Sequence, residues 1–320
     1  MPAYCRTQIG SPLGNSPLIN PLRSKFPKIS QTQTLTLRMV SESGSTKRPT
    51  CTRCSKPTRI CLCNRLKTPT LHNSVAITIL QHTLEKNHPL NSTRIATIGL
   101  KNTHIITVSD VCFQAQFLIR LLHRSCTLDE VENKDVIDVT IEKKGATSSL
   151  STTNFDQLFS SSNVAYHDLR KGFAVKKLKR KLLSSNEYEE SEEFNIAVPS
   201  GSVLLFPSEE SVDVEDVSFE VKNLIVLDGT WAKAKRMYNE NPWLKLLPHI
   251  RLDFDKLSLY SEVRRQPRAG YLSTIESVVY ALKAVGEDSE GLDGLLDVFE
   301  SMVGDQRRCK DERLSKVSEL

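Results

Sequence analysis

Short runs of apolar and β-branched residues alternate with longer stretches of helical periodicity from about residue 75 onward. Parallel strands need long crossovers, usually helices, so this alternation predicts an α/β fold class with a mostly parallel sheet. The apolar runs are far shorter than the roughly 20 residues of a bilayer-spanning helix, so we expect no membrane association. The predicted strands are 75–80, 104–108, 164–167, 202–206, 223–227 and 250–253, and the predicted helices are 92–100, 111–123, 231–239, 273–285 and 292–303.

Three polar stretches interrupt the alternation, at 145–154, 184–193 and 208–220. Because they lack an apolar period, they are predicted to be loops or insertions. The sequence contains no internal repeat.

The net charge of +5 comes from the first fifty residues, which carry seven Lys or Arg and a single Glu. The other 270 residues hold 36 basic and 37 acidic side chains, a net charge of −1. This balance excludes a general polycation mechanism for holding nucleic acid. Any such binding must come from local basic patches.

The first fifty residues contain thirteen Ser or Thr and six of the fourteen prolines, with no acidic residue before Glu42. This Ser-rich, acid-poor composition is typical of an organelle transit peptide, so residues 1–49 predict import into a plastid or mitochondrion. A disordered tail kept in the mature protein is the alternative. Initiation at Met39 would remove most of the segment and leave a cytoplasmic or nuclear form.

Four of the eight cysteines form a CxxC pair followed six residues later by a CxC pair: Cys51, Cys54, Cys61 and Cys63. Four thiolates this close can surround one zinc ion, and Pro57 favours the turn between the pairs. With sulfur at all four positions no site is left for water, so we expect a structural zinc knuckle over 50–68 and no hydrolytic zinc chemistry. Disulfides or chance spacing are the alternatives. The scattered cysteines are expected to be reduced: Cys5, Cys112, Cys126 and Cys309.

Polar residues follow three of the predicted strands at their carboxyl ends. Gln81 and His82 follow the first strand, Ser208 follows the strand at 202–206, and Asp228 follows the strand at 223–227. In open α/β sheets the ligand binds beyond the carboxyl ends of the strands. We therefore expect the functional site at this edge.

The run 224–236, which contains an Asp, a Thr and a Trp, resembles the signature of the DTW-domain family. Three further elements agree with that family in type and order: the cysteine pairs, the segment 81–94 and the segment 264–276. Together they cover most of the chain outside the first fifty residues.

The resemblance implies a tRNA-uridine aminocarboxypropyltransferase, which moves the 3-amino-3-carboxypropyl group of S-adenosylmethionine to N3 of a tRNA uridine and releases methylthioadenosine. It also implies a domain over 69–320 with a SPOUT-like fold, in which the chain is knotted around the cofactor. The expected partner is tRNA, and nothing in the sequence indicates an obligate protein partner.

Uridine N3 is a weak nucleophile until its proton leaves, so a carboxylate within hydrogen-bond distance is a reasonable requirement. Asp228 is the expected base, and the alternative is a turn or N-cap residue. Thr230 is a second catalytic candidate or a helix cap. Trp231 is either a core residue or a planar surface for the uridine.

The resemblance also suggests where the cofactor binds. Ser273 and Glu276 match a capping box, and the same helix start offers amides and a positive dipole end to the cofactor carboxylate. The residues 205–208 are either a plain strand end, where Pro207 breaks the ladder, or a loop whose backbone binds the adenine. Glu85 and Asn91 are further candidates for binding the cofactor amine or backbone. The cofactor-binding candidates are Leu205, Phe206, Pro207, Ser208, Gly270, Leu272, Ser273, Thr274 and Glu276.

Three local basic groups are candidates for RNA contacts: 170–181, 233–236 and the arginines Arg264, Arg265 and Arg268. Charge runs are usually solvated faces, and we expect this of 233–236. The three arginines directly precede the candidate cofactor helix, where they are predicted to bind tRNA phosphates. Basic residues of the knuckle are a second expected RNA contact.

Two other interpretations fit the same residues. One is an S-adenosylmethionine-dependent RNA methyltransferase of similar fold, which would release S-adenosylhomocysteine. The other is a non-catalytic zinc-knuckle protein that only binds RNA. The residues leave open which tRNA and which uridine is modified, whether rRNA is the substrate instead, and the oligomeric state.

Overall fold

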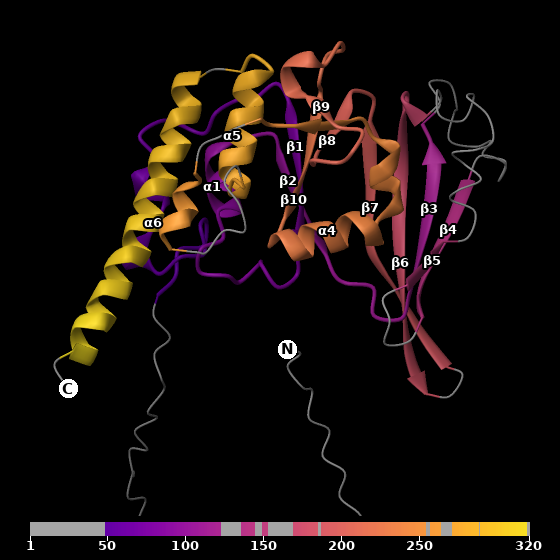
Figure 1. Ribbon diagram of the computed structural model, residues 1–320, viewed down its shortest axis with the longest axis horizontal. Helices are drawn as coiled ribbons and strands as arrows, with labels where there is room; N and C mark the ends of the chain where they lie inside the picture. Colours follow the sequence, from indigo (N-terminus) through magenta and orange to yellow (C-terminus); the bar gives the residue numbers. More distant parts are fainter. Residues whose placement is uncertain are drawn as a thin grey trace, which may run out of the picture. The chain divides into compact units, whose positions relative to one another are not determined.

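The computed structural model describes residues 49–122, 136–144, 149–152, 169–184, 187–253, 257–263, 271–287 and 289–318. Two sheets with helices around them make up this part of the chain (Figure 1). The predictions for residues 1–48, for a strand at 164–167 and for Cys5 and Cys126 lie outside the described residues.

The first sheet has six strands: β1 (Ala76–His82), β2 (Thr103–Val108), β8 (Ser202–Leu205), β9 (Val212–Asp213), β10 (Asn223–Asp228) and β11 (His249–Arg251). Their order is β2-β1-β10-β8-β11-β9, and every neighbouring pair is parallel. The predicted parallel sheet is confirmed, and so are the strands near 75–80, 104–108, 202–206 and 223–227. The strand predicted at 250–253 begins one residue earlier and ends at Arg251.

The central strand β10 shows why these runs form parallel strands. All six of its residues are buried. Leu224 and Val226 pack into the core on one face of the sheet, while Ile225 and Leu227 pack into the core on the other. A sheet covered on both faces needs apolar residues at successive positions, which is the composition of this run.

Helices α1 (Thr93–Gly99), α5 (Thr274–Ala284) and α6 (Ser289–Ser318) pack together on one side of the parallel sheet (Figure 1). Helix α4 (Trp231–Glu240) lies on the other side. These four helices confirm the predictions at 92–100, 231–239, 273–285 and 292–303, although α6 is much longer than expected. None of the described helices combines the length and apolar composition needed to cross a membrane. Short 3-10 turns complete this part: η1 (Thr58–Ile60), η2 (Cys63–Arg65), η4 (Val214–Asp216), η5 (Pro242–Leu246) and η6 (Leu259–Glu262).

A second sheet, which the sequence did not predict, is antiparallel and has the order β5-β4-β3-β6-β7. The prediction of a helix at 111–123 was wrong, because that region contains strand β3. The prediction of a loop at 184–193 was also wrong, because most of it belongs to β7. The strands are β3 (Gln114–Leu121), β4 (Val136–Lys144), β5 (Ser149–Thr152), β6 (Gly172–Ser184) and β7 (Glu187–Pro199).

Both errors have a physical cause. Ala115, Phe117 and Ile119 are fully buried at alternate positions of β3, which is the period of a strand. In β7 the first six residues are all exposed, so the segment has no buried face that would produce an apolar period. The predicted loop at 208–220 contains only β9 and η4 as short elements, and the loop at 145–154 includes β5, with its remainder outside the described residues.

Candidate active site

A pocket of about 350 Å³ lies at the carboxyl ends of β1, β8 and β10. The residues after these three strands and the start of α5 form its walls. This is where an open parallel sheet binds its ligand, because successive crossovers leave a crevice there. The structure brings eleven of the predicted site residues to this pocket: Glu85, Asn91, Asp228, Thr230, Trp231, Leu205, Phe206, Pro207, Leu272, Ser273 and Thr274.

Asp228 is the last residue of β10 and is only 6% exposed. The Gln81 side chain donates a hydrogen bond of 2.8 Å to Oδ2, and the Thr274 hydroxyl donates one of 2.6 Å to Oδ1. Gln81 is the register partner of Asp228 on the neighbouring strand. Two neutral donors therefore fix the orientation of the carboxylate. Each carboxylate oxygen can accept more than one hydrogen bond, so capacity for a ligand remains.

The cap of α4 is Thr230, not Asp228. Its hydroxyl accepts a hydrogen bond of 3.4 Å from the amide of Lys233, which settles the capping alternative in favour of Thr230. Gly229, between Asp228 and Thr230, lets the first turn of α4 lie close to the end of β10. A Cβ at this position would lie only 3.0 Å from the Cβ of Lys233. The carboxylate of Asp228 is thus left for the pocket.

Aromatic side chains form one wall of the pocket. Trp231 is half-buried and lies against Tyr271, with ring centroids 4.1 Å apart and planes inclined by 32°. Phe206 stacks on Tyr238, with centroids 4.4 Å apart and planes inclined by 18°. Trp231 therefore lines the pocket while its side chain also packs against the apolar core. Such a wall can accept the flat face of a nucleobase.

Two predicted residues, Ser208 and Glu276, are not among the described residues that line the pocket. The Ser208 hydroxyl is 2.6 Å from Nδ1 of the buried His249. The Glu276 carboxylate accepts from the Ser273 amide in a complete capping box and from the Ser258 hydroxyl. Gly270, Arg264, Arg265 and Arg268 lie outside the described residues.

The sequence assigned no individual role to Gln81, and it named Glu85 only as a candidate for the cofactor amine. Gln81 was part of the family segment, but nothing indicated that it contacts Asp228, 147 residues away. Glu85 lines the pocket, and its Oε1 lies 2.7 Å from Nζ of Lys233 on α4. Only the parallel pairing of β1 with β10 could have revealed the contact between Gln81 and Asp228.

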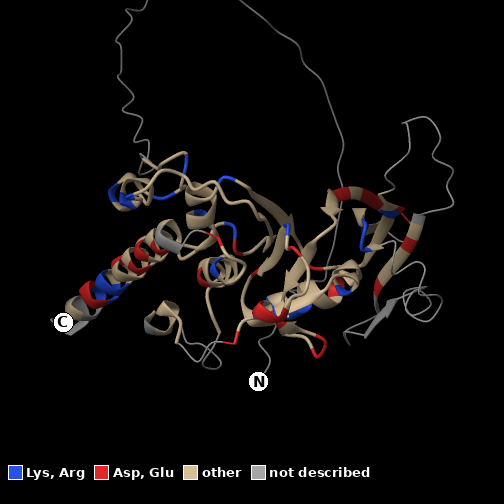
Figure 2. Ribbon diagram, turned by 90° about the horizontal axis from the view of Figure 1, so that it is seen from above, with Lys and Arg blue, Asp and Glu red and all other residues tan. Residues whose placement is uncertain are grey.

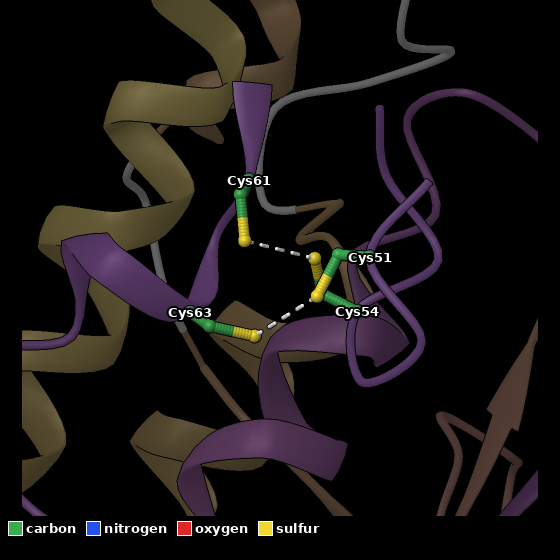
Figure 3. A group of neighbouring side chains, drawn as sticks. All are labelled: Cys51, Cys54, Cys61 and Cys63. Atoms are coloured by element: carbon green, nitrogen blue, oxygen red, sulfur yellow. Dashed lines mark hydrogen bonds between the residues drawn. The ribbon is translucent and has the colours of Figure 1, made fainter. Parts of the chain in front are cut away.

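The four cysteines of the knuckle come together as predicted (Figure 3). The Sγ atoms of Cys51 and Cys63 are 3.8 Å apart, and those of Cys54 and Cys61 are 3.7 Å apart. A tetrahedral zinc ion with Zn–S bonds of about 2.3 Å needs S···S separations of about 3.8 Å. All four are free thiols, so the disulfide alternative is excluded for them, and Cys112 and Cys309 are free as expected.

The electrostatics of this cluster also suit a cation. Hydrogen bonds from the backbone amides of Cys54 and Arg53 lower the pKa of Cys51 to about 6. Burial, followed by the neighbouring thiols, raises the pKa of Cys63 to about 12. Several thiolates in contact repel one another, and a divalent cation among them removes that repulsion. The residues therefore fit the expected zinc ion.

Most basic residues of the knuckle make contacts within the protein. Arg53 donates to the carbonyl of Ile98 at 3.1 Å, and Arg65 forms an ion pair of 2.6 Å with Asp305 of α6. Lys56 is buried and donates to the carbonyl of Pro89. The knuckle thus rests against α1, α6 and the loop between β1 and α1.

The basic run 170–181 lies mainly on β6, and its charges are largely paired with the acidic strand β7. Cross-strand ion pairs of 2.7 to 3.1 Å join Lys176 to Glu192, Lys177 and Lys179 to Glu193, and Arg180 to Glu190. The last helix, α6, carries only acidic charges in its first half and both acidic and basic charges toward its carboxyl end (Figure 2). Neither element presents a continuous basic face.

Comparisons with known proteins identify a family and several named relatives. The model of the DTW domain matches residues 48–128 and 145–307. The chain is 22% identical over 280 residues to the tRNA-uridine aminocarboxypropyltransferase 2 of Macaca fascicularis, which covers 84% of this chain and 70% of that protein. It is also 22% identical over 247 residues to the Mus musculus protein of the same name, and this match covers 76% of this chain and 58% of that protein. No solved structure matches significantly.

A shorter stretch is more similar. Over 83 residues the chain is 37% identical to the tRNA-uridine aminocarboxypropyltransferase 2 of Drosophila melanogaster. This stretch covers 25% of this chain and 33% of that protein. The matched regions therefore span from about one third to 70% of the length of these relatives.

Proposed function

The chain belongs to the DTW-domain family, and from this premise we propose that it transfers the 3-amino-3-carboxypropyl group of S-adenosylmethionine to N3 of a tRNA uridine. The observation that carries the proposal is the Asp228 carboxylate, oriented by Gln81 and Thr274 at the wall of a pocket beyond the strand ends. The names of the relatives point to the same reaction.

The pocket has the features that S-adenosylmethionine requires. Its volume falls within the range of ligand pockets, and the backbone of 205–207 and an aromatic wall offer a place for adenine. Leu272, Ser273 and Thr274 lie at the amino end of α5, where the helix dipole favours a carboxylate. When bound, the cofactor supplies an electrophilic carbon beside its sulfonium.

Asp228 has the central role in the proposed mechanism. It accepts the proton of uridine N3, because the deprotonated nitrogen is the nucleophile. N3 then forms a bond to the aminocarboxypropyl carbon, and the carbon–sulfur bond breaks with its electron pair left on the sulfur of methylthioadenosine. Trp231 and Tyr271 offer a planar surface beside the carboxylate. Selection among the carbons attached to the sulfonium depends on orientation.

The remaining elements of the proposal concern organisation. We assign residues 50–68 to a structural zinc knuckle and 69–320 to the transferase domain. The knotted SPOUT-like arrangement, in which the chain is threaded around the cofactor, is part of this proposal. The parallel sheet, with its pocket between strand ends and α5, supports it. Residues 1–49 remain proposed as an organelle address or a tail.

The test is a transfer assay with unmodified tRNA and S-adenosylmethionine labelled separately in the methyl or the carboxyl position. We expect the carboxyl label on RNA and release of methylthioadenosine. Methyl label on RNA with S-adenosylhomocysteine would show a methyltransferase instead. RNA binding without any transfer would favour a non-catalytic RNA-binding protein, and rRNA tested in parallel distinguishes the substrate class.

A further inference from the structure

The charged side chains that line the pocket are acidic. Among the described residues of the wall, Asp228 and Glu85 are charged, and the wall includes no Lys or Arg. Two carboxylates beside aromatic rings suit a ligand with positive centres. S-adenosylmethionine has two such centres, the sulfonium and the ammonium of its amino-acid end.

Glu85 is held in place by its backbone as well as its side chain. Its amide donates to the carbonyl of His82 at 2.8 Å. Its carbonyl accepts from the amide of His88 at 3.0 Å and from the Asn91 side chain at 3.0 Å. The carboxylate therefore has a defined position in the loop between β1 and α1, although this loop is not regular secondary structure.

Lys233 of α4 forms an ion pair with the carboxylate of Glu85. Its Nζ is 2.7 Å from Oε1 of Glu85, and the side chain of Glu85 is 7% exposed while that of Lys233 is 26% exposed. The charge of Lys233 offsets the cost of burying the Glu85 carboxylate. A carboxylate offers about four acceptor positions on two oxygens, so pairing with Lys233 does not prevent it from accepting a ligand ammonium.

We propose that Glu85, positioned by Lys233, binds the ammonium group of the amino-acid end of S-adenosylmethionine. This inference rests on the proposed function. Asp228 is unsuited to this role, since Gln81 and Thr274 orient it for the uridine proton. Glu85 lines the pocket from a different segment, the loop between β1 and α1, together with Leu90, Asn91 and Ser92.

The assignment has a consequence for the reaction. The ammonium belongs to the group that is transferred, so the modified uridine carries it away and the nucleoside product lacks it. Glu85 therefore contributes to binding of the substrate and not of methylthioadenosine. A contact made only with the transferred group also helps to place its carbon, and not the methyl carbon, opposite the nucleophile.

The experiment is calorimetric titration of the full chain with three ligands: S-adenosylmethionine, S-adenosylhomocysteine and methylthioadenosine. The first two carry the ammonium, only the first carries the sulfonium, and the third has neither. For Glu85→Gln we expect the first two to bind about 10- to 100-fold more weakly, the effect of losing a charged hydrogen bond. Methylthioadenosine should bind within about twofold of the wild-type affinity.

Two variants separate ligand binding from a structural role. The double variant Glu85→Lys with Lys233→Glu keeps an ion pair between loop and helix but reverses the charge that faces the pocket. We expect it to bind methylthioadenosine normally and the other two ligands weakly. Lys235→Met, an exposed position on the same helix, is the matched control for changing a lysine of α4.

Several results would overturn the assignment. Recovery of S-adenosylmethionine binding in the charge-reversed pair would show a purely structural ion pair. Loss of S-adenosylmethionine binding alone in Glu85→Gln would place the sulfonium, and not the ammonium, beside Glu85. Equal loss for all three ligands would indicate a damaged pocket without ammonium recognition. A wild-type protein that binds none of them would instead refute the proposed function itself.

Discussion

Thr274, the first residue of α5, donates a hydrogen bond of 2.6 Å to Oδ1 of Asp228, the last residue of β10. The two residues are 46 positions apart in the chain. The contact joins the end of a central strand to the start of a capped helix. Both elements have buried, well-packed faces, so the carboxylate is held by the rigid part of the fold.

Replacing Thr274 by Val should remove this donor while keeping the shape of the side chain. We expect the rate of transfer to fall about tenfold, because Asp228 then has one fixed oxygen and more rotational freedom. The Kd for methylthioadenosine should change little. Thr274→Ser restores a hydroxyl and should recover most of the rate in the same single-turnover assay. An unchanged rate in Thr274→Val would show that Asp228 does not need this bond.

Asp228→Ala should abolish modification, because no other described carboxylate in the pocket is placed in the same network. RNA binding should persist, since the change removes one buried side chain. Transfer is measured with labelled cofactor, and RNA binding by a filter or gel-shift assay at fixed salt. Full activity of this variant would remove Asp228 from the mechanism.

The double variant Cys51→Ser with Cys54→Ser should lower the folded yield and abolish stoichiometric zinc, because two of four thiolates are lost. Zinc content is measured by atomic spectroscopy and stability by thermal unfolding. Cys112→Ser changes an exposed cysteine outside the cluster and is the matched control. Zinc and stability that match the wild-type values would refute the structural assignment of the knuckle.

The knuckle should also influence the pocket through Lys56. This buried side chain donates to the carbonyl of Pro89, next to the pocket residue Leu90. We expect Lys56→Met to weaken S-adenosylmethionine binding by about three- to tenfold and RNA binding much less, since the carbonyl of Pro89 loses the donor that fixes this loop. Arg59→Ala, a change at an exposed position of the knuckle, serves as the comparison. A selective loss of RNA affinity in Lys56→Met would contradict this expectation.

Lys177 is fully buried on β6 and lies 2.7 Å from Glu193 of β7. Burial lowers the pKa of Lys177, and the charge of Glu193 opposes that shift. Lys177→Met leaves the Glu193 charge with less compensation and should reduce the free energy of unfolding by about 3–5 kcal/mol. Urea denaturation measures the change. Lys176→Met, at a more exposed ion pair of the same hairpin, should cost less than about 1 kcal/mol.

Several elements could be predicted because their signals are local. The capping box of Ser273 and Glu276 and the cap formed by Thr230 each depend on residues within one helical turn. The four cysteines lie within thirteen residues, so their spacing alone indicated one site.

The antiparallel sheet could not be read in the same way. The apolar residues of β3 are compatible with a helix when the partners are unknown, and the period of two is confirmed only by pairing with β4 and β6. In β6 and β7 the charged residues neutralise one another across strands, as Arg180 and Glu190 do. A run of like charges in the sequence therefore looked like a surface for RNA.

The sequence by itself determined the parallel core, the cysteine cluster, the helix caps and the family, because apolar period, ligand spacing and capping are properties of nearby residues. Only the tertiary structure decided that Gln81, Asp228 and Thr274 form one hydrogen-bonded group and that Glu85 meets Lys233 at the pocket. These contacts depend on strand order and on how helices pack on the sheet. Hydrogen bonds and ion pairs act over a few ångströms, so their partners are set by the folded chain and not by distance along it.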